Sequence, residues 1–545
     1  QHFVFGFHGH QVSEDIKTLI RDYYLGNVIL MKRNVLDAKQ VRNIVRELQS
    51  IAKESGHEKP LLIGIDQENG LVSAFSSPTA GTQFPGAMAL AATGNPDIAY
   101  QVSAATAKEL KMVGINWVYS PVADVNSDSR NPVIGVRSYG DESKEVTRYA
   151  SSVARGLTSC GIAPSAKHFP GHGDTYVDSH LALPVIRKTR SQLEATELVP
   201  FNALIHGTPP IASVMIGHMA LPDLTGDNTP ASLCPKITNE LLRNQMGYDG
   251  VVVTDCLEMD AIAEPLQGGC GVEEGALRSL LAGADVAMVC HTFERHVGSI
   301  NRVYAAVENG ELPYGELVTS GRRIAKMKDE FAGNWGDVLV RETEETFQKE
   351  WNELKKMNME LSRTAYQKSL AVVWGTEKLP LKVEKKKKLL LFTPTMESLN
   401  RAVDDPEGVL RDRLGRLRNT AGASYLGLAS EVQKRVTTMR HIVYSSHEDV
   451  DKNIISDARA IVFVLRNADR SIWQKHYLRK VLTQSKDIPV ILLASCGPYD
   501  LAGAEDLHEK TVFIATFEFT RNAFEAFVEV AFDGNEAQGC MPVSI

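Results

Sequence analysis

The sequence predicts an α/β protein with an N-terminal (β/α)8 TIM barrel and a C-terminal three-layer α/β/α sandwich. Short apolar runs alternate eight times with amphipathic helical stretches over roughly the first three hundred residues, the repeat that closes a barrel. After a highly charged segment, a second set of apolar runs alternates with helices. At 545 residues the chain is too long for one core. We expect a catalytic barrel at residues 1–335, a helical linker at 336–384 and the sandwich domain at 385–545.

The barrel strands are predicted from the apolar runs. They are Phe3–Phe7, Asn27–Met31, Leu61–Ile65, Asn116–Ser120, Ala163–Lys167, Ala212–Gly217, Val251–Thr254 and Asp285–Val289. Helix signals separate them, as in NPDIAYQVSAATAKELKMVG. There Asn95 can cap the helix, Pro96 suits its first turn, and Gly114 can close it in a left-handed conformation.

The second domain is predicted from nearly continuous apolar runs, which are typical of a parallel sheet covered on both faces. The predicted strands are Leu389–Thr393, His441–Ser445, Ala460–Leu465, Pro489–Ala494 and Val512–Ala515. A Gly-x-Gly-x-x-Gly fingerprint is absent from the sequence, so a dinucleotide role has no support.

Composition narrows the class of protein. The net charge of −8 and the lack of a basic stripe argue against a nucleic-acid partner. Apolar runs all fall short of the roughly 20 residues that cross a bilayer, so we expect no membrane partner. Seven irregularly spaced cysteines read as free thiols, which favours a cytoplasmic protein. The chain opens almost inside a strand with QHFVFGF, which leaves room for upstream residues, a targeting segment among them.

Titratable residues follow six of the eight predicted barrel strands, at or just past each strand end. They are Asp66, Asp124, Lys167 with His168, His218, Asp255 and His291. The carboxyl ends of barrel strands form the active-site face of this fold. The pattern therefore predicts an enzyme active site at the carboxyl-terminal face of the barrel.

The stretch SAKHFPGHGDTYVDSHLALP, Ser165–Pro184, holds three histidines and two aspartates on a glycine-rich backbone. Gly171 and Gly173 let the backbone fold closely around a ligand. Asp178 lies two residues before His180, and a carboxylate can hold one imidazole nitrogen while the other exchanges a proton with substrate. This pair is suited to general acid/base catalysis.

Four blocks, in order, resemble the signature of family 3 glycoside hydrolases, in their two-domain β-N-acetylglucosaminidase branch. They are GIDQENG, NPVIGVRSYG, KHFPGHGDTYVDSH and VVVTDCLEM. The final GCMPVSI resembles the segment that closes the second domain of the family. The resemblance spans nearly the whole chain.

The resemblance implies a retaining exo-β-N-acetylglucosaminidase that removes terminal β-linked GlcNAc by double displacement. Asp255 matches the nucleophile that forms a covalent glycosyl-enzyme, and His180 with Asp178 matches the general acid/base dyad. Substrate binding is expected from Asp66, Arg137, Lys167 and His168. Neither a metal nor a cofactor is expected.

Other residues near the predicted mouth receive supporting roles. We expect His172 to be structural, Cys256 to be a packing residue, and Asp124, His218 and His291 to support the residues that touch substrate. The chain reads DQENGLVSAF where the bacterial pattern reads DQEGGRVQR, so Leu71 and Ala74 replace two arginines. A bacterial preference for cell-wall fragments is therefore not carried over. Chitin-derived oligosaccharides or simple β-GlcNAc conjugates are expected as substrates at least as much as cell-wall fragments, and the oligomeric state stays open.

Four alternatives remain. A β-N-acetylglucosaminide phosphorylase would use the same dyad, because a neutral histidine does not repel a phosphate dianion. A metal-dependent hydrolase would use His168, His172, His180, Asp174 and Asp178, although their spacing matches no zinc signature. A Schiff-base lyase would use Lys167. A sugar-binding protein that has lost catalysis would not need Asp178 and His180.

Overall fold

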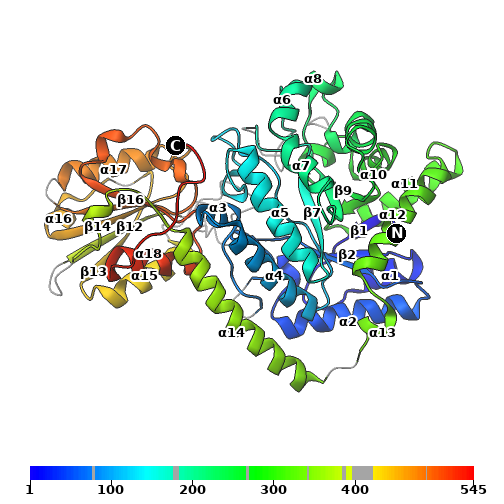
Figure 1. The fold of residues 1–545 in the computed structure, drawn as a ribbon, viewed down its shortest axis with the longest axis horizontal. Coiled ribbons are helices and arrows are strands. Elements are labelled where there is room, and N and C mark those ends of the chain that lie inside the picture. The colour runs from blue at the N-terminus through cyan, green and yellow to red at the C-terminus, as the bar shows by residue number, and fades with distance from the viewer. Residues whose placement is uncertain are drawn as a thin grey trace. The chain divides into compact units, whose positions relative to one another are not determined.

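The computed structural model describes residues 1–76, 80–175, 183–264, 269–340, 343–382, 388–395, 421–447, 449–485 and 488–545. The chain divides into two compact units (Figure 1). The first comprises Gln1–Gln83, Asp97–Ile134 and Asp141–Glu360, and the second Phe84–Pro96, Gly135–Gly140 and Leu361–Ile545. Among helices in these described ranges, none has the length and apolar character needed to span a bilayer.

The first unit is a closed parallel barrel with the strand order β1-β10-β9-β8-β7-β6-β3-β2. All eight strands predicted from the sequence are present. They are β1 (Phe3–Phe5), β2 (Asn27–Leu30), β3 (Leu62–Ile65), β6 (Trp117–Val118), β7 (Ala163–Phe169), β8 (Ser213–Ile216), β9 (Val251–Cys256) and β10 (Val286–Val289). Alternate residues from these strands, such as Val4, Ile29, Leu62 and Met215, fill the barrel interior. The predicted barrel is confirmed.

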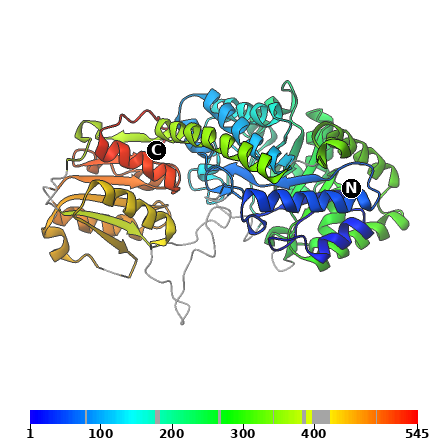
Figure 2. The ribbon, with the colours of Figure 1, turned by 90° about the horizontal axis from the view of Figure 1, so that it is seen from below.

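Helices surround the barrel, and the longer ones each bury an apolar face (Figures 1 and 2). In α2, for example, Val41, Ile44, Val45 and Leu48 are buried. The helices of this unit are α1 (Glu14–Asp22), α2 (Ala38–Glu54), α4 (Pro96–Met112), α5 (Ser143–Ser159), α6 (Arg190–Ala195), α7 (Leu198–Ile205), α8 (Pro222–Thr225), α9 (Asp260–Ala263), α10 (Val272–Leu281), α11 (Phe293–Glu308), α12 (Tyr314–Phe331) and α13 (Trp335–Val338), with a π-helix at Lys236–Gln245.

Helix α4 has the ends expected from its sequence. It begins at Pro96, and Gly114 two residues past its end has a φ of +86°. A two-stranded antiparallel hairpin, β4 (Gln67–Asn69) with β5 (Val72–Ser73), follows β3 directly. This hairpin places a second acidic residue beside the end of β3, as described below.

The second unit is built on a six-stranded sheet with the order β11-β16-β15-β14-β12-β13. The strands are β11 (Ala371–Trp374), β12 (Lys388–Pro394), β13 (Met439–Tyr444), β14 (Ala458–Leu465), β15 (Val490–Ala494) and β16 (Thr511–Ala515). Figure 1 shows α16 (Lys452–Ser456) and α17 (Trp473–Gln484) on one face, and α15 (Gly422–Arg435) and α18 (Arg521–Val528) on the other. The predicted three-layer sandwich is confirmed.

One strand of this sheet was not predicted, and it changes the sheet class. Strand β11 pairs antiparallel with β16, so the sheet is mixed rather than wholly parallel. It is a half-buried edge strand that follows α14 (Glu344–Ser369) within the segment read as a helical linker. Its sequence, AVVW, is a short apolar run, so a signal for the strand was present at the end of the charged segment. The predicted boundaries at residues 335 and 384 stay predictions.

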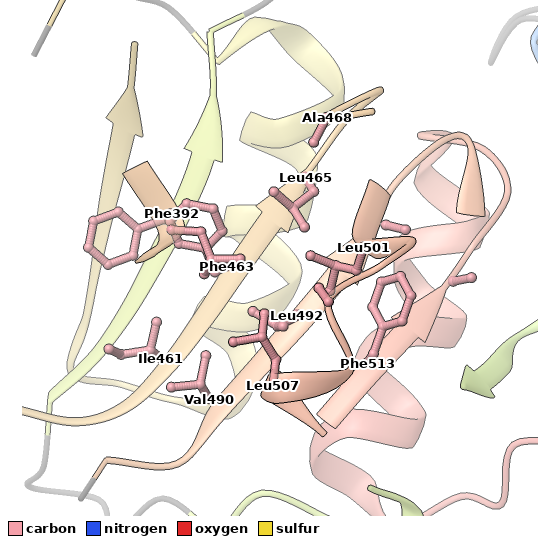
Figure 3. Close-up of a cluster of buried hydrophobic side chains, with 14 of the residues drawn as sticks. Phe392, Ile461, Phe463, Leu465, Ala468, Val490, Leu492, Leu501, Leu507 and Phe513 are labelled. Carbon is pink, nitrogen blue, oxygen red and sulfur yellow. The ribbon is translucent and has the colours of Figure 1, made fainter. Parts of the chain in front are cut away.

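The core of the second unit includes a segment from far upstream in the chain. Phe392, Phe463, Leu492 and Phe513 of neighbouring strands pack together (Figure 3). Met88, Ala89 and Ala92 of α3 (Ala87–Ala92) belong to the same cluster. The Gly86 N–H donates to the Glu518 carboxylate at 2.9 Å, which anchors the start of α3 to the residues that follow β16.

Candidate active site

Four of the predicted site residues lie at the carboxyl ends of barrel strands. Asp66 follows β3, Lys167 and His168 lie near the end of β7, and Asp255 is the last residue but one of β9. The predicted positions at the strand ends are therefore observed for these residues.

Lys167 forms the centre of a buried ion-pair group. Its Nζ lies 2.7 Å from Asp66 Oδ1 and 2.6 Å from Glu68 Oε1, and its side chain is only 2% exposed. Glu68 is equally buried, whereas the Asp66 side chain is 31% exposed. Of the two carboxylates, Asp66 is the one with surface left to meet a ligand.

Sequence reasoning did not single out Glu68, although a signal was present. Residues i and i+2 of an extended segment project to the same face, and Asp66 and Glu68 stand in this relation where β3 leads into β4. A lysine predicted nearby, at the end of another strand, would need partners for its charge when buried. The two carboxylates of the DQE triplet, Asp66 and Glu68, supply these partners.

His168 is held by the fully buried Asp124. The His168 Nδ1 lies 2.7 Å from Asp124 Oδ2, and the backbone N–H groups of His168 and His172 donate to Asp124 Oδ1 at 3.0 and 2.8 Å. Because a carboxylate only accepts, Nδ1 carries the proton, and Nε2 is the acceptor when the ring is neutral. The peptide bond between Lys167 and His168 is cis.

Asp124 is ionised despite its burial. Burial raises the pKa of the carboxyl group, but the charge and hydrogen bond of His168, followed by those of His172, outweigh it and leave the pKa below its ordinary value. The predicted supporting role of Asp124 agrees with this geometry.

The glycine turn after β7 packs closely against neighbouring segments of the barrel unit. A Cβ on Gly173 would lie 1.5 Å from the Val125 carbonyl oxygen, and one on Gly171 would lie 2.7 Å from Glu197 Cβ. Asn131 Nδ2 donates to the carbonyls of His172 and Gly173 at 2.8 and 3.0 Å. These glycines therefore permit close approach between protein segments, and the expected fold of the turn around a ligand stays a prediction.

The end of β9 is fixed from several sides. The Cys256 N–H donates to Asp255 Oδ1 at 2.7 Å, and the Leu257 N–H donates to the Met288 carbonyl at 2.9 Å. Buried His218 donates from Nε2 to the Cys256 carbonyl at 2.9 Å, while its Nδ1 lies 2.8 Å from the Ser232 hydroxyl. Asp255 itself is half-buried, so its carboxylate sits on a rigid, partly accessible strand end.

Cys256 lies in a group that the sequence did not reveal. Its sulfur, the sulfur of Cys290 and a ring nitrogen of His291 all lie within 4.8 Å of one another. A hydrogen bond from the Cys290 thiol, helped by His291 and opposed by burial, lowers the pKa of Cys256 to about 6. The same hydrogen bond together with burial raises the pKa of Cys290. The reading of Cys256 as a simple packing residue is therefore incomplete.

The remaining predicted residues are placed differently. Asp178 and His180 lie outside the described residues. Arg137 ends a short 3-10 turn, Gly135–Arg137, that belongs to the second unit, and it is buried there. His291 is exposed, and its backbone N–H donates to Glu258 Oε2 at 2.6 Å.

Two of the alternative chemistries lose support from the geometry. Two carboxylates beside Lys167 stabilise its ammonium form, which has no lone pair for Schiff-base formation. Asp174, a member of the alternative metal set, pairs with Lys188 at 3.2 Å, which neutralises its carboxylate without a metal. Across the part of the chain that the structure describes, the donor group found for a metal is Cys256, Cys290 and His291 instead.

The chain is similar to known hydrolases along its length. Residues 4–327 match the model of the glycosyl hydrolase family 3 N-terminal domain. Beta-hexosaminidase A of Pseudoalteromonas piscicida is 34% identical over 336 residues, which are 58% of this chain and 55% of that protein. Beta-hexosaminidase LpqI of Mycobacterium tuberculosis is 34% identical over 322 residues, covering 58% of this chain and 79% of that protein.

Two solved structures share the full architecture. A fungal multi-domain GH3 β-N-acetylglucosaminidase superposes with a TM-score of 0.89 at 34% identity, and covers 100% of this chain and 60% of its own. The GH3 β-N-acetylglucosaminidase of Paenibacillus sp. str. FPU-7 has a TM-score of 0.82 at 30% identity, with coverage of 100% and 97%. This chain thus spans little more than half of the Pseudoalteromonas and fungal proteins. By its matching barrel and these relatives, the chain belongs to glycosyl hydrolase family 3.

Proposed function

We propose that this chain is a retaining exo-β-N-acetylglucosaminidase that acts on terminal β-linked GlcNAc of oligosaccharides or glycoconjugates. The observation that carries the proposal is the half-exposed Asp255 carboxylate on the fixed end of β9, at the strand-end face that also bears the Asp66–Lys167–Glu68 group and the Asp124-held His168. The Paenibacillus β-N-acetylglucosaminidase, nearly all of whose length this chain covers, supports the substrate class.

Asp255 is the nucleophile of the proposed reaction. Its carboxylate attacks the anomeric carbon of the GlcNAc ring while the bond to the leaving oxygen breaks, and a covalent glycosyl-enzyme results. Protonated His180 gives its proton to the leaving oxygen, and Asp178 holds the ring in position. His180 then takes a proton from water as the water attacks the anomeric carbon. Two inversions leave the sugar in its β configuration.

Sugar recognition falls to the charged groups of the strand ends. Hydrogen bonds between hydroxyls and charged groups are roughly twice as strong as neutral ones. Asp66 and the acceptor Nε2 of His168 are suited to bond hydroxyl groups of the terminal sugar, with Lys167 orienting Asp66. We assign Arg137 to the same task on the resemblance of NPVIGVRSYG to the family block.

Hydrolysis of a nitrophenyl β-GlcNAc by the purified chain is the direct test. We expect turnover in the native chain and none in Asp255→Ala, while the exposed control Asp223→Ala keeps native turnover because its side chain lies on the surface. A native chain that does not release nitrophenol, but still binds GlcNAc, would favour the non-catalytic sugar-binding alternative.

The role of His180 is tested by the leaving group. We expect His180→Ala to slow hydrolysis of chitobiose far more than that of the nitrophenyl glycoside, because a phenolate leaves without protonation. Equal losses on both substrates contradict the assignment of His180 as the acid.

The acceptor is tested by the product. We expect free GlcNAc alone when inorganic phosphate is added, with no GlcNAc-1-phosphate. Phosphate-dependent appearance of the sugar phosphate would assign the chain to phosphorolysis instead.

A further inference from the structure

We propose that Cys256, Cys290 and His291 form a binding site for a thiophilic divalent cation of the Zn²⁺ type at the mouth of the barrel. The two sulfurs and a ring nitrogen lie within 4.8 Å of one another. In a tetrahedral zinc site with metal–ligand bonds of about 2.0–2.3 Å, ligand atoms lie roughly 3.5–3.8 Å apart. The three donors therefore need to move by about 1 Å or less to close on one ion.

The barrel topology creates this site. Cys256 is the last residue of β9 and Cys290 follows the last residue of β10, and these strands are neighbours with Met288 opposite Cys256. The parallel strands deliver both sulfurs to the same edge of the sheet, although the residues are far apart in sequence. His291 is adjacent to Cys290 in the chain.

The backbone under the donors is fixed, while one donor is free to adjust. The Cys290 carbonyl accepts from Arg33 Nη2 at 2.7 Å, the Cys256 carbonyl accepts from His218 Nε2, and the His291 N–H donates to Glu258. Cys290 is buried and Cys256 half-buried, so solvent does not compete strongly for their sulfurs. His291 is exposed, and its ring can swing onto an arriving ion.

The donor types select the class of cation. Two sulfurs and an imidazole favour Zn²⁺, Cd²⁺ or Co²⁺, whereas Mg²⁺ and Ca²⁺ prefer oxygen ligands. Three protein ligands leave the fourth tetrahedral position for water or an exogenous ligand.

The location of the site implies inhibition, a consequence that rests on the proposed function. Cys256 adjoins Asp255, and its N–H already donates to the Asp255 carboxylate. A dication held one residue away attracts the electrons of this carboxylate and makes it a weaker nucleophile. Occupied sites should therefore turn over more slowly, so the ion acts as an inhibitor and not as a cofactor.

Cobalt titration of the full-length, reduced protein tests the site without substrate. We expect a thiolate-to-cobalt charge-transfer band that saturates at one equivalent and disappears when Zn²⁺ displaces the cobalt. Loss of even an outer partner of a ligand costs about 10–100-fold in metal affinity, so His291→Ala and Cys290→Ser should each weaken binding at least tenfold. Cys160→Ser, which removes a half-exposed cysteine elsewhere on the barrel unit, should leave the titration unchanged.

Different outcomes separate the possible failures. A band that persists in both Cys290→Ser and His291→Ala overturns the site. A second result would also overturn the site. In it, protein purified without reductant carries a Cys256–Cys290 disulfide, seen as the loss of two hydrogens by mass spectrometry, and the same protein fails to bind cobalt after the disulfide is reduced. Because His291 is exposed, its alanine variant is expected to fold normally, which thermal melting will check.

In the hydrolysis assay, we expect Zn²⁺ to inhibit the native chain. The His291→Ala variant should require a Zn²⁺ concentration at least tenfold higher for the same inhibition. Native binding of cobalt by a chain without hydrolase activity would sink the proposed function and leave the metal site intact.

Discussion

At the scale of single residues, the site depends on charges that are paired before any substrate arrives. Lys167 stands between two carboxylates of unequal exposure, and His168 is fixed by a carboxylate that solvent does not reach. Because the two carboxylates differ in exposure, we assign them different roles. Buried Glu68 stabilises the Lys167 ammonium, and the more exposed Asp66 is available to bind the sugar.

We expect Asp66→Asn and Glu68→Gln to have opposite profiles. Asp66→Asn should raise KM for the nitrophenyl glycoside by about 10-fold or more, since a hydrogen bond to a charged group contributes roughly 1.5–3 kcal/mol. It should lower Tm less than Glu68→Gln does, because the Asp66 side chain is partly solvated. Glu68→Gln should instead lower the free energy of unfolding by about 1–3 kcal/mol, because it removes one partner of a buried ammonium. Urea unfolding and steady-state kinetics on both variants measure the split. A similar KM and stability change in the two variants would contradict it.

We expect Asp124→Asn to destabilise the protein by about 3 kcal/mol at pH 7, the cost of breaking a buried pair. The folded pKa of Asp124 is lowered, so its contribution is present above the unfolded value of about 3.9 and is lost as the pH falls through the folded value. The difference in stability between native and variant chains should therefore shrink as the pH falls below about 4. Thermal melts across this range measure it, and a difference that grows toward acid would contradict the assignment.

At the scale of elements, close packing between segments explains the glycine turn after β7. Gly173 lies where the Val125 carbonyl leaves no space for a side chain. The turn connects β7 to the stretch that carries Asp178 and His180, so the chain enters that stretch from a fixed point. This makes Gly173 a positioning residue in the proposed function.

We expect Gly173→Ala to lower hydrolysis at least tenfold and to destabilise the barrel by about 1–3 kcal/mol, the usual cost of overpacking. The matched control is Gly315→Ala in α12, where an added Cβ meets nothing within 4 Å. That change should be neutral or stabilising by up to about 1 kcal/mol, because alanine favours the helix. Near-native activity and stability in Gly173→Ala would contradict the close approach.

Glu518 performs a comparable task in the second unit. Its buried carboxylate accepts from the Gly86 N–H and from the Tyr366 hydroxyl, and so joins the segment after β16 to the start of α3 and the end of α14. Each of these segments comes from a different part of the sequence.

We expect Glu518→Ala to lower the free energy of unfolding by about 2–4 kcal/mol, because it leaves two buried donors without an acceptor, each costing about 1–3 kcal/mol. The exposed Glu536→Ala is the control and should be neutral. Urea unfolding followed by far-ultraviolet circular dichroism checks both, and equal stabilities of the two variants would contradict the anchoring role.

Sequence patterns revealed those elements whose physical signal is local. Buried parallel strands such as β2 and β14 consist mostly of consecutive apolar residues, so their positions could be predicted. Strand β11 is short and half-buried, and its place in the sheet depends on pairing with β16, about 140 residues downstream. The same difference between local and long-range signals explains which site residues could be predicted. Asp66, Lys167 and Asp255 were predicted from strand ends, whereas the partnership of Cys256 with Cys290 requires the order of strands around the barrel.

At the scale of the whole molecule, the two units are interleaved along the chain. Residues 84–96 and 135–140 leave the barrel sequence to complete the second unit, whose main body begins only at Leu361. Met88, Ala89 and Ala92 pack with strands β12 to β16 as part of one core. Contiguous domain boundaries drawn from composition do not reveal this exchange of segments.

We expect a truncated chain of residues 1–360 to aggregate or to melt well below the full chain, because residues 84–96 lose the core into which they pack. Adding residues 361–545 as a separate polypeptide should restore part of the stability. Light scattering and thermal melts of the fragment, alone and with its complement, provide the measurement. A fragment as soluble and stable as the full chain would contradict the shared core.

The interleaving also constrains how such a protein can change over generations. Because residues 84–96 and 135–140 are encoded inside the barrel's own stretch of sequence, a single recombination event near residue 360 cannot transfer the second unit intact. A hybrid made this way would combine residues 361–545 of one parent protein with residues 84–96 and 135–140 of another. Point mutations would then have to restore the packing between these segments, so the two units should evolve together.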